Sequence, residues 1–142
     1  MHPYVWKAAQ PIVEFCEKHG IIIASYGGAT PLARVPNGPL KDILPTIRAR
    51  LEQMRGAPVT EGQVLSKWIL QKGAVVITCV ICISRQWVMI DIQSRTSAKM
   101  ARIQEFLDTE HVPDLRKEET GAIEEAGSKL HQRIFMRHIF SD

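Results

Sequence analysis

The most reactive-looking pattern in the sequence is a pair of cysteines, Cys79 and Cys82. Their Cys-x-x-Cys spacing occurs in thiol redox centres and in half of a tetrahedral zinc site, which needs four ligands. The chain has one further cysteine, Cys16, and no second pair. The pair lies in an apolar, strand-like run, where cysteine behaves as a small hydrophobe. We therefore predict neither a metal site nor a redox role.

A second candidate for chemistry is the loop from Tyr26 to Pro39, which contains three glycines and three prolines. It follows the run Ile21–Ser25, whose apolar residues without polar alternation are typical of a parallel strand buried on both faces. Loops at the carboxyl ends of parallel strands carry the ligand sites of α/β folds. We expect this loop to border a ligand site.

Helix signals surround that strand. Pro11 can open a helix, because its missing N–H would be unpaired there anyway, and Gly20 can close it in a left-handed conformation. A second helix is predicted from about Leu40 to Met54, with Pro45 in or near its first turn.

The remaining chain continues the alternation of helices and strands. A capping box at Thr60 and Gln63 predicts a helix that Gly73 stops, and Ala74–Thr78 follows as a second buried strand. A later helix is capped at Thr96 or Ser97, and a short one spans about Lys117–Ala126. The order predicts βα units around parallel strands. Two clear strands leave two open edges, so we expect part of a larger α/β fold.

In chain order these segments resemble the C-terminal part of an aldo-keto reductase of the fungal ketoreductase branch. His2-Pro3-Tyr4 resembles the end of the sixth barrel strand. The other matching segments, in order, are Pro11–Cys16 with His19–Ile21, Ser25–Gly27, Thr60–Gly73, Thr96–Arg102 and Glu118–Gly127. Each motif is modest alone, but their order covers nearly the whole chain, and this makes the resemblance specific.

The resemblance implies a (β/α)₈ TIM barrel that passes hydride from NADPH to a small-molecule carbonyl substrate, with a place in fungal secondary metabolism. Residues 1–142 would form a partial domain with about strands six to eight and their helices. The family's catalytic tetrad of Asp, Tyr, Lys and His lies in the first half of the barrel and has no counterpart here. We therefore assign no catalytic residue and expect no activity from this chain alone.

The resemblance also assigns NADP contacts. Tyr26 matches the ring that stacks on the nicotinamide, and Ser97 matches a donor to the adenosine 2′-phosphate at a helix start. Arg102 matches the guanidinium on the adenine and facing that phosphate, and Glu105 matches an acceptor for the adenine amino group. Lys99 would supply the phosphate contact that the family often places just before Ser97. Each also has a structural alternative, namely a bonded core tyrosine, a helix cap or a solvated charge. We expect weak or absent NADPH binding.

Residues 79–95 depart from the family pattern, because the family runs directly from the eighth strand into the helix after it. These 17 residues correspond to 51 nucleotides, a whole number of codons. We predict that they come from a retained short intron. The alternative is a hairpin over Ala74–Ile92, with Ser84–Asp91 as its second strand.

Composition narrows the other function classes. A formal net charge of +3 is too small to imply nucleic-acid or membrane binding, and we interpret the basic tail Lys129–Arg137 as a solvated segment. The longest apolar run, Ala74–Ile83, is too short to span a bilayer. With three cysteines and no signal peptide, we expect a cytoplasmic protein. Two alternatives remain. One is a non-catalytic module that binds nucleotide or pairs with a full-length barrel through its open strands, and the other is an unrelated small α/β protein with a basic tail. The open strand edges also allow self-association.

Overall fold

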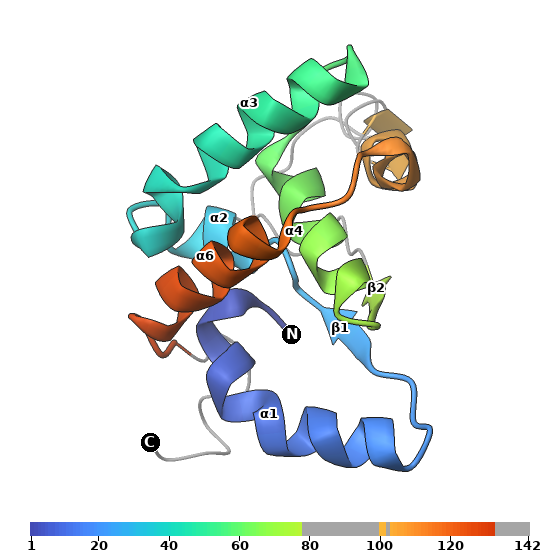
Figure 1. Ribbon diagram of the computed structural model, residues 1–142, viewed down its shortest axis with the longest axis vertical. Coiled ribbons are helices and arrows are strands. Elements are labelled where there is room, and N and C mark those ends of the chain that lie inside the picture. The colour runs from blue at the N-terminus through green and yellow to red at the C-terminus, as the bar shows by residue number, and fades with distance from the viewer. Residues whose placement is uncertain (78–99, 102, 133–142) are drawn as a thin grey trace, which may run out of the picture.

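The computed structural model describes residues 1–77, 100–101 and 103–132. These residues form a mostly helical fold with a small parallel sheet (Figure 1). The elements in order are α1 (Pro3–Lys18), β1 (Ala24–Tyr26), α2 (Thr30–Arg34), the 3-10 helix η1 (Pro39–Asp42), α3 (Leu44–Arg55), α4 (Glu61–Gln71), β2 (Val75–Ile77), the 3-10 helix η3 (Asp108–His111) and α6 (Lys117–Ser128). Residues 100–101 and 103–107 are also helical. This arrangement is that of a partial α/β fold, and it does not test the predicted eight-stranded barrel.

Helix α1 corrects two predictions at the start of the chain. His2-Pro3-Tyr4 does not end a strand: His2 is the N-cap of α1, and Pro3 opens the helix where its missing N–H breaks no hydrogen bond. Pro11 therefore lies inside the helix, where it costs one backbone hydrogen bond. Burial of Tyr4 and Trp6 in the first turns explains why the helix begins early. Gly20, with a φ of 66°, follows the helix end as predicted.

The two strands pair in parallel, with Ser25 opposite Val76 at the centre of the register. Both are shorter than predicted, because each has three residues. The prediction that they are buried on both faces is wrong. Ser25 is fully buried on one face, whereas Val75 and Ile77 on the other are 51% and 44% exposed. The sheet is therefore covered on one side by the described residues.

Helices α4 and α6 begin where the sequence predicts. The capping box of α4 is present: the Gln63 backbone N–H donates to Thr60 Oγ1 at 3.1 Å, and the Thr60 N–H donates to Gln63 Oε1 at 3.0 Å. The predicted second helix is divided into η1 and α3, and Pro45 lies in the first turn of α3. Helix α6 extends two residues past its predicted end at Ala126.

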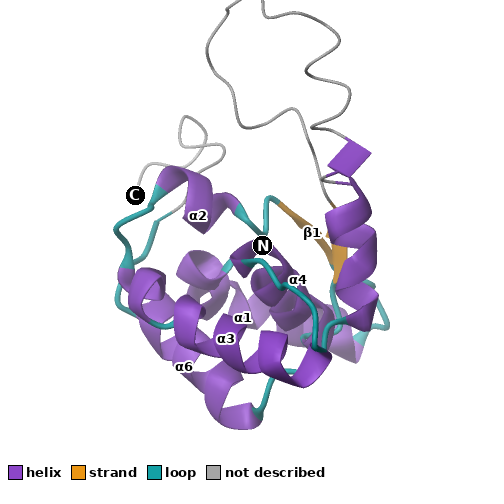
Figure 2. Ribbon diagram, turned by 90° about the horizontal axis from the view of Figure 1, so that it is seen from above, coloured by secondary structure: helices purple, strands orange, loops and turns teal. Residues whose placement is uncertain are grey.

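The core lies between the helices, and Figure 2 shows α1, α3, α4 and α6 gathered on one side with β1 at the margin. Trp68 of α4 is fully buried and meets Trp6 of α1 edge to face, with ring centroids 5.2 Å apart. Helix α6 crosses α1 closely at Gly127, where an added Cβ would lie 2.5 Å from the Pro3 carbonyl oxygen. The helical layer is thus closely packed.

No helix in the described ranges is long and apolar enough to cross a membrane. The predicted insertion at residues 79–95, with its intron and hairpin explanations and the pair Cys79 and Cys82, lies outside the described residues. The same is true of most of the predicted basic tail.

Candidate functional site

The candidate site lies at the carboxyl end of the sheet, where Tyr26 is the last residue of β1. Its side chain is 43% exposed, and its carbonyl oxygen accepts a hydrogen bond from the Met1 ammonium at 3.1 Å. Ser25 Oγ donates to the Met1 carbonyl at 2.6 Å. These two contacts place the start of the chain along β1. Tyr26 therefore lies at the strand end that the sequence predicts for it.

Of the other predicted cofactor residues, only Glu105 is described. It lies in the helical segment 103–107, which precedes η3. Ser97, Lys99 and Arg102 lie outside the described residues. Whether the five side chains meet around one nucleotide thus stays a prediction.

Glu105 makes two contacts with the N-terminus of α4. Thr60 Oγ1 donates to its carboxylate Oε1 at 2.5 Å, and Gln63 Nε2 donates to its backbone carbonyl at 2.7 Å. The capping residues of α4 therefore also hold the segment 103–107 in place. An adenine amino group could still bind the second carboxylate oxygen of Glu105.

Sequence reasoning identified Thr60 and Gln63 as a helix cap but missed their partner 45 and 42 residues away. The capping-box motif is a local signal, spaced by three residues, and it contains nothing about a distant carboxylate. A buried Gln63 with an amide group left over from the capping box was the available clue, because a buried amide needs partners for its donors.

The turn η3 is fixed to α3 by charge. The Arg55 guanidinium donates to the Asp108 carboxylate and holds the pKa of Asp108 below its usual value. His111 Nδ1 lies 3.4 Å from the same carboxylate. In the described part of the chain, no three His, Cys, Asp or Glu side chains are grouped to hold a metal ion. These ion pairs anchor the turn.

His2 is the most strongly shifted titratable group in the described part of the chain. Burial lowers its pKa to about 4, with smaller contributions from the N-terminal ammonium and His131. The imidazole is 3% exposed and forms an edge contact with Tyr4, with ring centroids 6.1 Å apart. The imidazole is therefore neutral at pH 7, and it packs at the N-cap of α1.

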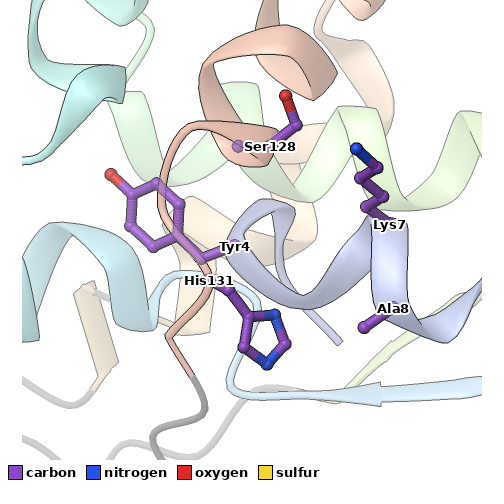
Figure 3. A pocket seen from close by; sticks show the side chains of 6 residues that line it. Tyr4, Lys7, Ala8, Ser128 and His131 are labelled. Carbon is purple, nitrogen blue, oxygen red and sulfur yellow. The ribbon is translucent and has the colours of Figure 1, made fainter.

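A small pocket of about 160 Å³ lies between α1 and the end of α6 (Figure 3). Its lining residues are Tyr4, Lys7, Ala8, Gly127, Ser128 and His131. Pockets that hold drug-sized ligands have about 300–1,000 Å³, so this one is small for a nicotinamide dinucleotide. None of the predicted cofactor residues lines it.

Comparison with known proteins finds a reductase. The chain is 31% identical over 138 residues to an NAD/NADP-dependent indole-3-acetaldehyde reductase of the fission yeast Schizosaccharomyces pombe. The alignment covers 97% of this chain but 40% of the relative, so the chain spans less than half of that protein's length. No family model matches the chain. The likeness is consistent with a fragment of a reductase of the aldo-keto type.

Proposed function

We propose that this chain is the cofactor-binding C-terminal part of an NAD(P)-dependent aldo-keto reductase barrel, which reduces a small carbonyl compound when the barrel is whole. The observation that carries the proposal is the 31% identity to an NAD/NADP-dependent aldehyde reductase along 97% of this chain. An identity spread along the whole chain favours a shared fold and a shared cofactor over a single common motif.

The sheet geometry supports the cofactor role. Because β1 and β2 are parallel and Tyr26 lies opposite Ile77, both residues lie at the carboxyl end of the sheet. The carboxyl ends of parallel strands carry the ligand sites of α/β barrels. Tyr26 would stack on the nicotinamide there. Ser97, Lys99 and Arg102 follow β2 in the sequence and would bind the 2′-phosphate, with Glu105 against the adenine.

The chemical step requires groups that this chain does not supply. Carbonyl reduction needs a proton donor as the hydride arrives, and no segment of these 142 residues resembles the family's tetrad. The proposed role of the chain is therefore to bind and orient the nicotinamide cofactor, and the remainder of the barrel would supply the tetrad.

A chimeric reductase tests the proposal. Residues 1–142 would replace the matching 40% of the fission-yeast reductase, with a second version that lacks residues 79–95. We expect the version without residues 79–95 to oxidise NADPH with indole-3-acetaldehyde. Adding Arg102→Ala should raise KM for NADPH more than KM for NADH, since only NADPH has the 2′-phosphate. A folded chimera that neither binds nor oxidises NADPH contradicts the proposal.

The isolated chain provides a second test. It holds part of a 2′-phosphate site, so we expect NADPH to bind with a dissociation constant weaker than about 1 mM, or roughly 4 kcal/mol. We also expect no reductase turnover. Micromolar affinity that Arg102→Ala abolishes, or turnover that a single substitution abolishes, would show that this chain is a complete enzyme or binding module.

We also propose that residues 79–95 come from a retained intron. Without them, β2 would lead directly into the helix after it through a short βα turn, which is the favoured connection length. Sequencing transcripts across this region tests the idea. If every transcript carries the 51 nucleotides and a full-length protein with the insertion is active, the segment is genuine protein.

A further inference from the structure

The outer face of the sheet has a composition that is unusual for a surface. Ala24 and Tyr26 point to the same side as Val75 and Ile77, because side chains alternate along a strand and the register pairs Ala24 with Val75 and Tyr26 with Ile77. Ile22, two residues before Ala24, continues this side ahead of β1. Ile22 is 76% exposed, and Val75 and Ile77 are about half exposed. None of these positions is charged. We call Ile22, Ala24, Tyr26, Val75 and Ile77 the outer sheet face.

The opposite face of the same strands is covered. Ser25 is fully buried, and Ile23 and Val76 contact the helical core. Figure 1 shows α4 on the inner side of β2, with the strands at the margin of the molecule. Parallel sheets are nearly always covered on both faces. The outer sheet face is therefore a surface for which the described residues provide no cover.

The edges of the sheet give the same indication. The described strands form one pair, so each strand has an outer edge. At the edge of β1 the Tyr26 carbonyl already accepts a hydrogen bond from the Met1 ammonium, whereas no described strand pairs with the outer edge of β2. An occupant that presents β-strands could extend the sheet and lay apolar side chains on the outer sheet face. An isolated helix would cover the face but leave the edge of β2 without a strand.

The relative of this chain indicates where such strands come from. The chain spans 40% of the fission-yeast reductase, so three-fifths of that protein's length has no counterpart in the alignment. We propose that the outer sheet face docks this missing part of a reductase when it is present as a separate polypeptide, so that two chains complete one catalytic unit without a covalent link. This inference rests on the proposed function.

The test mixes the full chain with the unaligned three-fifths of the fission-yeast reductase, tagged and produced separately. We expect a one-to-one complex by size-exclusion chromatography with light scattering. Ile77→Lys should weaken the complex at least tenfold, because a buried lysine charge would oppose docking. Met54→Lys is the control, since Met54 is an exposed apolar residue near the end of α3, outside the outer sheet face. Met54 is 59% exposed and Ile77 is 44% exposed. This control should leave binding unchanged.

If Ile77→Lys unfolds the chain, amide hydrogen exchange of the unmodified chain still tests the docking. Adding the tagged fragment to the unmodified chain should slow exchange of the Val75–Ile77 amides at least tenfold, while the amides at the exposed end of α3 remain unchanged. Absence of both a complex and this protection overturns the proposal.

Two other occupants would also overturn it. A homodimer of the chain that Ile77→Lys dissociates would identify a second copy as the occupant. Fragment binding that appears only after residues 79–95 are deleted would identify that segment as the cover. The covalent chimera distinguishes a failure of docking from a failure of the proposed function. If the chimera is active but its two parts do not associate as separate chains, the docking proposal alone is rejected. An inactive, folded chimera rejects the function.

Discussion

The two sides of the β1–β2 sheet differ in the elements that lie next to them. On the inner side, Trp68 and Ile69 of α4 are fully buried, Trp68 packs against Trp6 of α1, and α4 contacts β2. On the outer side, Ile22 projects from the surface although its side chain is as apolar as Ile69. Apolar residues therefore occur on both sides, and the presence or absence of neighbouring elements decides whether they are buried. The inner side is completed by helices of this chain, and the outer side lacks a described layer.

Truncation on each side gives the largest expected contrast. Trp68→Ala removes a fully buried ring that packs against Trp6, and such changes cost about 3–5 kcal/mol in the free energy of unfolding. Ile22→Ala removes atoms that are already exposed, so we expect a change within about 0.5 kcal/mol. Urea denaturation followed by circular dichroism measures both. Equal losses would show that the outer side is covered in solution.

Acid should weaken the inner side through His2. Its pKa is about 4 in the folded chain and 6.5 as the ordinary value, so the unfolded chain binds more protons between these pH values. Above pH 6.5 the imidazole is neutral in both states and has no effect. As pH falls from 6.5 to 4, stability decreases by up to about 3 kcal/mol, and below pH 4 this loss is complete.

The control for this pH dependence is a surface histidine. His2→Gln should remove most of the slope between pH 6.5 and 4, whereas His111→Gln should retain it, because His111 is exposed. Denaturant midpoints at half-unit pH steps give the measurement. A slope that persists in His2→Gln would assign the pH dependence to other groups.

Two glycines of α6 sharpen the comparison within one helix. A Cβ on Gly127 would lie 2.5 Å from the Pro3 carbonyl oxygen, which is rigid backbone, so Gly127→Ala should cost about 1–3 kcal/mol. A Cβ on Gly121 meets nothing within 4 Å. Gly121→Ala should therefore stabilise the helix by about 0.5–1 kcal/mol. The melting temperature should fall for Gly127→Ala and rise for Gly121→Ala. Shifts in the same direction would show that Gly127 does not lie against Pro3 in solution.

The sequence predicts the parts of this fold that depend on neighbours in the chain. The capping box at Thr60 marks the start of α4 because the motif completes itself within three residues. The start of α1 was wrong, because Pro3 and Pro11 are equally able to open a helix and only the burial of Tyr4 decides between them. The sequence predicted both strands but wrongly predicted burial on both of their faces. The residues that bury a sheet face come from distant parts of the sequence, so the strand segments contain no signal for them.

The candidate site shows the same limit. Tyr26 was placed at a strand end from the apolar run before it and the glycines after it, both of which are local signals. The contact of Glu105 with Thr60 joins residues 45 positions apart, and no pattern in either segment indicates it. Long-range polar contacts need a fold before they can be identified.

The smallest expected effect concerns that contact, and it tests whether Glu105 is committed to structure. Thr60→Ala removes the α4 cap and should cost about 1 kcal/mol, whereas Thr60→Ser keeps the hydroxyl and should cost little. In a double-mutant cycle with Glu105→Ala, we expect a coupling energy of about 0.5 kcal/mol, because the hydrogen bond between Thr60 Oγ1 and the Glu105 carboxylate is exposed. Chemical denaturation of the four proteins measures it. A coupling energy of zero would mean that the Glu105 carboxylate is not held by Thr60 in solution, which would leave both oxygens to accept an adenine amino group.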